Sequence, residues 1–436
     1  MTLGASLFAV RGSLAGLDDR RRRLLCDRTA ASDPGLRERV AALVAEVRRD
    51  GDAALRRLAR ELDGVELEAL DVPPSAWTAA LSSLDAALRE ALERAAAAIR
   101  SVHQALRPGS VRVVSPDGAV ITRRPDPLAR VGVYAPGGRA AYPSSLLMGA
   151  LPARAAGVGE IIVCAPPGRD GKPAAVVLAA AAIAGVDRLF AVGGAGAVSA
   201  MAYGTSSIPR VDRIVGPGNA WVNEAKLQVS RDVGIDAPAG PSELLIIADD
   251  SASPARVAGE LAAQAEHDPE AAVVLVTTSP ALAEEVETEL EQLLRTAPRA
   301  EIIRASLATR GGVLLAASIA DAVAFAADYA PEHLLLACRE PGEVAARTRN
   351  AGAVFLGESS SVVFGDYSTG ANHVLPTAGA ARTWSGLSTL DFVRWTTLQE
   401  VPAETAAALA ADTARLARAE GLPAHAEAVA TKESVA

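Results

Sequence analysis

The sequence predicts an α/β protein built on parallel sheets. From about residue 131 to about residue 356, short apolar runs with strand character alternate with helical segments. Strands joined through helices lie parallel, because a parallel pair needs a long crossover between its members. Several of these strands run directly into glycine turns, which such folds place at the carboxyl ends of their strands.

Length and composition indicate a large protein with more than one core. With 436 residues the chain is too long for one ordinary core, so we expect two or more domains. Half of the residues are apolar and only 3% are aromatic, which predicts a core of alanine, valine and leucine. The net charge of −9 provides no basic field for nucleic acid, so no nucleic-acid partner is expected.

The cysteines and the apolar runs predict a soluble, cytoplasmic protein. Cys26, Cys164 and Cys338 are too few and too scattered for a disulfide framework. The apolar patch Leu7–Val10 is short and has its positive charges behind it, unlike a targeting signal. The run Ala174–Val186 is shorter than the roughly 20 residues that a membrane span needs. We therefore expect no membrane association.

The first 130 residues are predicted to be mostly helical. Apolar periodicity marks one amphipathic helix around Leu36–Val47 and a long one over Leu81–Leu106. Val111–Val114 and Ala119–Ile121 then predict a hairpin, closed by the turn Pro116-Asp117-Gly118.

A first series of strands and helices follows. It comprises strands at 131–135, 160–165, 188–192 and 213–215, with helices at 146–156, at 174–184, up to Tyr203 and after Asn219. Three of its strands lead into Pro136-Gly137-Gly138, Gly193-Gly194-Ala195-Gly196 and Gly216-Pro217-Gly218-Asn219. Backbone amides at helix starts hold phosphates, so these turns suit a dinucleotide. The motif is weak, because Ser199 stands where a third glycine would be, and ordinary tight turns explain it as well.

A second series begins near residue 244. Strands are predicted at 244–248, 272–277, 313–315, 334–336 and 352–356, and helices at 254–265 and 320–329. The segment from about 391 to 436 is predicted to be mostly helical.

Four residues suggest a metal site. Gln264 and His267 stand three apart, so on a helix they share one face. Together with the distant Asp366 and His425 they make a nitrogen and oxygen ligand set for zinc or manganese. The alternative is a surface glutamine beside a histidine that ends a helix.

Glu332 and His333 adjoin just before a predicted strand. A carboxylate and an imidazole at a sheet edge are candidates for acid and base chemistry, since histidine is the usual base near neutral pH. The alternative is a loop pair between a helix and a strand that has no chemistry.

The motifs resemble those of the histidinol dehydrogenase family from about residue 35 to 430. The matching stretches are VGVYAPGG (131–138), AAYPSSLLMGALPARAAGV (140–158), VGGAGAVSAMAYGT (192–205), VDRIVGPGNAWVNEAK (211–226), DAPAGPSELLIIAD (236–249), QAEHD (264–268), APEHL (330–334), GDYSTGANHVLPT (365–377) and EGLPAHAEAV (420–429). So many specific stretches in one order make the resemblance strong.

The resemblance implies a zinc-dependent oxidation of L-histidinol through the aldehyde to L-histidine with two NAD, the last step of histidine biosynthesis. Glu332 would activate water, and His333 would take the hydroxyl proton. The implied zinc ligands, which also contact substrate, are Gln264, His267, Asp366 and His425. The other implied contacts are Ser242, His333 and Glu420 for substrate, and Tyr134, Gly196 and Asn219 for the cofactor.

The resemblance also implies a homodimer with shared active sites. Each chain would have two incomplete Rossmann-like parallel-sheet domains, small terminal segments and a swapped C-terminal arm. The implied division is an N-terminal segment 1–26, a first domain of 27–132 and 243–381 with the metal and catalytic motifs, a second, NAD-binding domain 133–242, and a helical arm 382–436.

One position departs from the family pattern. The family usually has glutamine as a cofactor contact where this chain has Gly196, which questions its cofactor affinity. Two rival functions stay open. One is oxidation of another small alcohol, such as a sulfonated diol, on the same scaffold. The other is a catalytically silent relative that only binds zinc or nucleotide.

Overall fold

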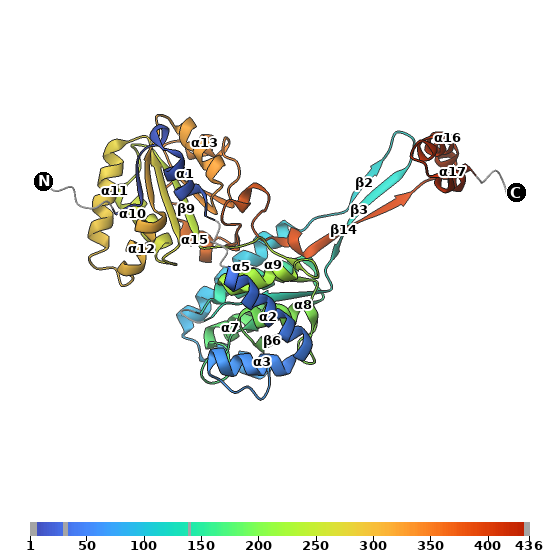
Figure 1. Ribbon diagram of the computed structural model, residues 1–436, viewed down its shortest axis with the longest axis horizontal. Coiled ribbons are helices and arrows are strands. Elements are labelled where there is room, and N and C mark those ends of the chain that lie inside the picture. Colours follow the sequence, from blue (N-terminus) through green and yellow to red (C-terminus); the bar gives the residue numbers. More distant parts are fainter. Residues whose placement is uncertain (1–6, 29–33, 138–140, 431–436) are drawn as a thin grey trace.

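The computed structural model describes residues 7–28, 34–137 and 141–430. It confirms an α/β protein, with two parallel sheets and one small antiparallel sheet (Figure 1). Each parallel sheet with its helices forms a lobe, and the antiparallel sheet extends away from both lobes as an arm.

The six-stranded sheet forms the first lobe. Its order is β1-β11-β10-β9-β12-β13, and all five pairings are parallel. The strands are β1 (Val10–Ser13), β9 (Glu243–Ala248), β10 (Ala272–Thr277), β11 (Gly312–Leu315), β12 (His333–Ala337) and β13 (Ala353–Leu356). All residues of β9, β10 and β12 are buried, because helices cover both faces of the sheet.

Two helical layers cover this sheet. One layer contains α10 (Pro254–Ala265), α11 (Pro280–Leu293) and α12 (Ala300–Arg310). The other contains α1 (Asp19–Cys26), α13 (Ile319–Tyr329) and α14 (Pro341–Ala345). The strand β1 was not predicted: it is four residues long and adds to the edge of the sheet beside β11.

The five-stranded sheet forms the second lobe, with the order β6-β5-β4-β7-β8 and only parallel pairings. The strands are β4 (Arg130–Tyr134), β5 (Glu160–Ala165), β6 (Arg188–Ala191), β7 (Arg213–Val215) and β8 (Gly234–Ile235). The helices on one face are α4 (Pro74–Ser83), α5 (Ala86–Ala105), α6 (Pro143–Ala156) and α7 (Ala175–Ala184). Those on the other face are α2 (Pro34–Asp50), α3 (Asp52–Leu58), α8 (Gly194–Tyr203) and α9 (Ala220–Val229).

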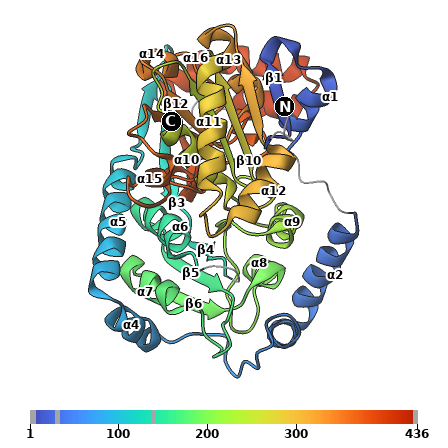
Figure 2. The ribbon, with the colours of Figure 1, turned by 90° about the vertical axis from the view of Figure 1, so that its left-hand side faces the viewer.

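The helices α2 to α5 pack on the five-stranded sheet, on its two sides (Figure 2). The apolar side chains of α2 face α8 and α9, and those of α5 face α6. The single helix predicted over Leu81–Leu106 is two helices. Asp85 starts the second one by accepting a hydrogen bond from the Leu88 N–H at 3.0 Å.

The arm is a three-stranded antiparallel sheet with two helices at its tip. The predicted hairpin is confirmed as β2 (Val111–Val114) and β3 (Val120–Pro127). The prediction of a mostly helical segment 391–436 was wrong for β14 (Val393–Glu400), which pairs along the whole of β3. Its valine, tryptophan and threonine residues favour a pleated strand once a partner strand is available. The tip consists of α16 (Ala403–Ala419) and α17 (Pro423–Ala430) (Figure 1).

Across the described ranges, every helix is too short or too polar to cross a membrane.

Candidate active site

The candidate catalytic residues lie at the amino end of the six-stranded sheet. His333 is the first residue of β12, and in the ladder it lies opposite Leu244 of β9. The helices α10 and α15 (Val362–Tyr367) follow strands and return toward this end. The last turn of α10 carries Gln264, and α15 carries Asp366, whose Oδ1 lies 3.9 Å from His333 Nε2.

His333 is buried in one defined tautomer. Its Nδ1 lies 2.9 Å from the backbone carbonyl oxygen of Glu243, which can only accept, so Nδ1 carries the proton. Burial lowers the His333 pKa to about 4, against the opposing effect of that hydrogen bond and with help from His267 and His373. At neutral pH the imidazole is therefore uncharged, and Nε2 has a free lone pair that can accept a proton.

Glu332 is also buried and shares the same backbone anchor. Its Oε2 accepts a hydrogen bond from the Glu243 N–H at 2.7 Å and lies 3.5 Å from His333 Nδ1. Burial raises the Glu332 pKa well above its usual value, and the charges of Glu243 and Asp366 add to this while the Glu243 N–H opposes it. A carboxylate whose pKa is raised is a stronger base than an exposed carboxylate.

Two of the four predicted metal ligands lie near this pair: Asp366 approaches His333, and His267 acts on the His333 pKa. Gln264 lies in the last turn of α10, three residues before His267. Gln264 is buried, and its side-chain amide makes no hydrogen bond with any residue that the structure describes. His267 is exposed, yet the protein atoms around its ring displace enough water to lower its pKa. Burial, with the nearby Glu260, raises the pKa of Asp366 to about 7.

The donor types fit a zinc ion that needs one more ligand. Within the described parts of the chain, no three His, Cys, Asp or Glu side chains converge on one point. Gln264, His267 and Asp366 offer an amide oxygen, an imidazole nitrogen and a carboxylate oxygen, which a divalent ion of intermediate softness accepts. A carboxyl group whose charge is disfavoured by burial indicates that a cation belongs there.

Three predicted substrate or metal contacts lie at the edge of this site or outside it, namely Ser242, Glu420 and His425. Ser242 is half-buried and directly precedes Glu243, so it belongs to the same end of the sheet. Glu420 and His425 are exposed at the tip of the arm, where they end α16 and lie in α17. The arm extends away from the site of its own chain, so one chain does not bring these two residues to Gln264 (Figure 1).

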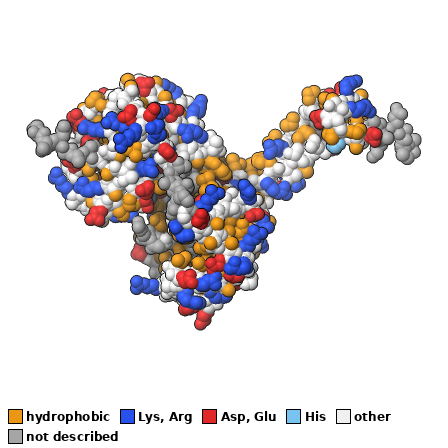
Figure 3. All heavy atoms as spheres, viewed as in Figure 1, with side chains coloured by type: hydrophobic (Ala, Val, Ile, Leu, Met, Phe, Trp, Pro, Cys, Tyr) orange, Lys and Arg blue, Asp and Glu red, His pale blue; other side chains and the backbone are white. Residues whose placement is uncertain are grey.

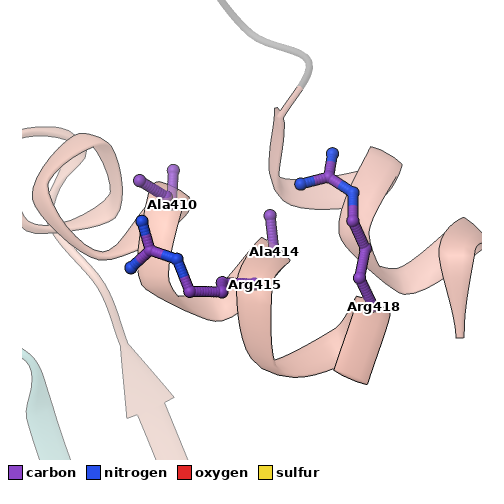
Figure 4. A pocket seen from close by; sticks show the side chains of 5 residues that line it. Ala410, Ala414, Arg415 and Arg418 are labelled. Atoms are coloured by element: carbon purple, nitrogen blue, oxygen red, sulfur yellow. The ribbon is translucent and has the colours of Figure 1, made fainter. Parts of the chain in front are cut away.

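A cavity of about 380 Å³ also lies on the arm. Its walls come from one face of α16 (Figure 4) and consist of Ala410, Ala411, Ala414, Arg415 and Arg418. Arg415 pairs with Asp412 at 2.6 Å on the exposed surface. This cavity offers no base or nucleophile, and it is separate from the candidate active site.

The predicted cofactor contacts lie at the carboxyl end of the five-stranded sheet. Tyr134 ends β4 and is buried, and its hydroxyl oxygen accepts a hydrogen bond from the Gly194 N–H at 3.1 Å. Asn219 caps α9, where its Oδ1 accepts from the N–H groups of Trp221 and Val222. Gly138, in the first predicted glycine turn, lies outside the described residues.

The third glycine turn is held by a buried ion pair that the sequence did not suggest. Lys226 pairs with Asp236, and both side chains are at most 3% exposed. Lys226 Nζ donates to the Gly216 carbonyl at 3.0 Å, while Asp236 Oδ2 accepts from the Gly216 N–H at 2.7 Å. Gly216 has φ +119°, and a Cβ there would lie 2.1 Å from the Tyr134 carbonyl oxygen, so only glycine fits.

Gly196 faces the protein interior. It is buried in α8, and a Cβ at this position would lie 3.1 Å from Leu58 Cδ1 and 3.4 Å from Leu55 Cδ2. The small residue leaves room for these leucines of α3.

The loop that contains Asn372 and His373 connects the amino end of the six-stranded sheet with the carboxyl end of the five-stranded sheet. His373 Nδ1 donates to the Asp366 carbonyl at 3.0 Å, and its Nε2 accepts from Ser145 Oγ of α6 at 3.1 Å. Asn372 donates to the Met148 carbonyl of the same helix at 2.8 Å. The amino end of the first sheet therefore lies next to the carboxyl end of the second. His373 is one of only five histidines, and that scarcity was the signal that could have singled it out.

Known proteins match this chain over nearly its whole length. The family model described as histidinol dehydrogenase matches residues 26–433. Histidinol dehydrogenase from Bordetella parapertussis is 47% identical over 400 residues, 91% of each chain. The protein of that name from Pseudomonas aeruginosa is 44% identical over 424 residues, 96% of each chain. The crystal structure of histidinol dehydrogenase from Elizabethkingia anophelis matches with a TM-score of 0.93 at 33% identity, over 98% of each chain. This chain belongs to the histidinol dehydrogenase family.

Proposed function

We propose that this chain oxidises L-histidinol to L-histidine through histidinaldehyde and reduces two NAD, the last step of histidine biosynthesis in the cytoplasm. The observation that carries the proposal is the uncharged His333, whose free Nε2 faces Asp366 beside Gln264 and His267. The homologous proteins named histidinol dehydrogenase support the choice of substrate.

In the first oxidation, the substrate alcohol loses a hydride and its hydroxyl proton. The His333 Nε2 takes the proton, because Nδ1 already donates to the Glu243 carbonyl. Removing the proton as the hydride leaves avoids a positive charge on the product oxygen. The aldehyde is the product of this step.

The second oxidation needs water, since the carbon must gain an oxygen. Glu332 lies next to His333 and has a raised pKa, so it can take a proton from water as the oxygen adds to the aldehyde. The hydrate is again an alcohol, and His333 can take its hydroxyl proton as the second hydride leaves. Each oxidation transfers one hydride. The first releases one proton, and the second releases two, because the acid that it forms ionises to a carboxylate.

Gln264, His267 and Asp366 are the residues of this chain that would hold zinc. When bound, zinc would fix the amine and imidazole of the substrate and so orient the reacting carbon. Tyr134 and Asn219, beside the N-termini of α8 and α9, would contact NAD.

We propose further that His425 and Glu420 complete the site of a partner chain in a homodimer with swapped arms. The arm carries its two residues away from its own site, and exposed hydrophobic side chains line its length (Figure 3). They include Val111, Val113, Val114, Trp395, Leu398, Leu416 and Leu422. Val363, Phe364 and Tyr367 of α15, next to Asp366, are exposed as well. Such surfaces usually mark an interface.

Subunit mixing tests the shared site. His425→Ala and Asp366→Ala should each inactivate the enzyme. When the two variants exchange subunits, one of the two sites in the heterodimer has both defects and the other has none, so activity should return. Exchange proven by mass spectrometry with no recovered activity would rule out a shared site.

Product counting tests the reaction. Purified protein with L-histidinol, zinc and NAD should form two NADH for each histidine, and chelation should stop turnover until zinc or manganese is added. A ratio of one NADH with aldehyde accumulating, or full activity without metal, would contradict the proposal.

A further inference from the structure

One residue, Glu243, holds both proposed catalytic side chains through its backbone. Its N–H donates to Glu332 Oε2 at 2.7 Å, and its carbonyl oxygen accepts from His333 Nδ1 at 2.9 Å. The two groups belong to the consecutive peptide units on either side of the Glu243 Cα, so a small displacement of this residue would move both anchors. It would also release the bond that keeps the proton on His333 Nδ1.

The side chain of Glu243 is in turn held by Arg28. Arg28 Nε donates to Glu243 Oε1 at 2.7 Å, and the same oxygen accepts from the Ala378 N–H at 2.7 Å. Both side chains of the ion pair are at most 3% exposed. The pair joins the segment after α1 to the first residue of β9.

Arg28 also holds the end of α13, the segment that leads to Glu332. Its Nη2 donates to the Tyr329 carbonyl at 2.7 Å, and the guanidinium carbon lies 3.5 Å from the centroid of the Tyr329 ring. The next residue, Ala330, has φ +53°, a conformation that residues other than glycine rarely adopt. Such a turn persists only where its surroundings hold it. Arg28 thus connects the two segments on which the position of Glu332 depends.

A buried ion pair is a poor device for stability alone. Well-packed apolar residues of similar volume usually stabilise a fold as much or more, because both charges must leave water. The planar guanidinium, with donors in a fixed fork, instead provides defined geometry. We infer that Arg28 and Glu243 are a positioning pair that sets the placement of Glu332 and His333 and the tautomer of His333. This inference rests on the proposed function of those two residues.

The variant Arg28→Met with Glu243→Met tests the inference without leaving one buried charge unpaired. The kcat should fall about 10–100-fold, because small misplacements of reacting groups have effects of this size. Alcohol and aldehyde oxidation should fall together, whereas Glu332→Gln should chiefly slow aldehyde oxidation. The KM for NAD should stay unchanged, because the cofactor turns belong to the other sheet.

Two further variants separate positioning from folding. Glu243→Gln leaves the buried Arg28 charge without a counter-charge, so less of this variant should fold. It keeps an oxygen that accepts from Arg28 and Ala378, so its folded fraction should retain most of the kcat. Arg22→Met is the matched control: Arg22 also joins α1 to α13, through Asp328 at 2.5 Å, but on the exposed surface. It should leave kcat unchanged. All rates are divided by the folded fraction, measured by circular dichroism and by NAD binding.

The outcomes are distinct. Wild-type protein that does not oxidise histidinol overturns the proposed function. Active wild type, with a folded double variant of unchanged kcat, overturns the positioning pair alone. An equal loss in Arg22→Met would mean that docking of α1, rather than positioning, matters.

Discussion

The two parallel sheets are built from the same alternation of strands and helices, yet they present their candidate functional groups at opposite ends. The five-stranded sheet has its glycine turns at the carboxyl ends of β6 and β7, where open α/β sheets usually bind ligands. The six-stranded sheet has Glu332, His333 and Glu243 at the amino ends of β12 and β9. The loop that carries His373 joins these two ends.

The chemical groups differ as well. At the proposed cofactor end, Tyr134 and Asn219 hold backbone amides of the glycine turns, and the buried charges of Lys226 and Asp236 hold one turn in place. The proposed catalytic end has side chains whose pKa values are shifted by burial. At the carboxyl ends of β9 and β12, Asp249 accepts from the N–H groups of Ser251 and Arg339, so an acidic side chain occupies these two amides.

Replacing His333 should have the largest effect. The loss should appear in kcat and should leave NAD binding at the other end unchanged. His333→Asn removes the proton acceptor while keeping a small polar side chain. The kcat for both oxidations should fall about 10²–10⁴-fold, the usual contribution of a general base. Stopped-flow measurement of NADH formation from histidinol and from histidinaldehyde checks this, with NAD affinity measured separately. Loss of NAD binding as well would mean that the two ends are not independent.

Replacing Gly216 should affect the cofactor end. Gly216→Ala places a Cβ against the Tyr134 carbonyl and forces φ +119° on a residue that disfavours it. Strain of about 1–3 kcal/mol should weaken NAD binding about 10–100-fold. Isothermal titration with NAD measures this, and Gly185→Ala is a control, since Gly185 has φ +67° but no neighbour within 4 Å of its Cβ. The affinity for histidinol should not change; a loss there would contradict separate roles for the ends.

The sequence predicted one end better than the other, for physical reasons. Glycine turns after strands have a local signature, so the turns at Gly193 and Gly216 could be located directly. Gln264 and His267 stand three apart in the sequence, which singled them out, although His267 lies beyond the end of α10 and not on its face. The anchor role of Glu243 could not be predicted, because it depends on backbone groups and on a strand pairing between segments 89 residues apart. The packing of α2 on the five-stranded sheet is a tertiary contact that periodicity alone does not specify.

The pH dependence of stability should distinguish the ends in metal-free protein. Burial lowers the His373 pKa from 6.5 to about 4, so its contribution to stability is complete above pH 6.5 and is lost as the pH falls to 4. Asp366 has the opposite sign: its pKa is raised from 3.8 to about 7, so its contribution is complete below pH 3.8 and is lost as the pH rises to 7.

Thermal unfolding between pH 7 and pH 5 measures both contributions as differences from wild type. His373→Asn should lose less Tm on acidification than wild type, and Asp366→Asn should lose more. Gly216→Ala, at the other end, should follow the wild-type pH dependence. Parallel pH profiles for all four proteins would show that neither group changes its pKa on folding.

The smallest expected effect concerns Gly196, the position at which the resemblance implies a glutamine. A glutamine amide that reaches the cofactor would contribute about 0.5–1.5 kcal/mol, but its Cβ must first displace Leu58 Cδ1, which would lie 3.1 Å away. The half-buried Leu58 side chain can move slightly, so Gly196→Gln should lower the KM for NAD a few-fold at most. Adding Leu58→Ala removes the crowding and should lower that KM further, while Leu58→Ala alone should not. Gly196→Ala is the control that adds the Cβ without the amide, and steady-state kinetics with varied NAD compares the four variants. An equal KM for the alanine and glutamine variants would mean that the amide never reaches the cofactor and that another group already fills its place.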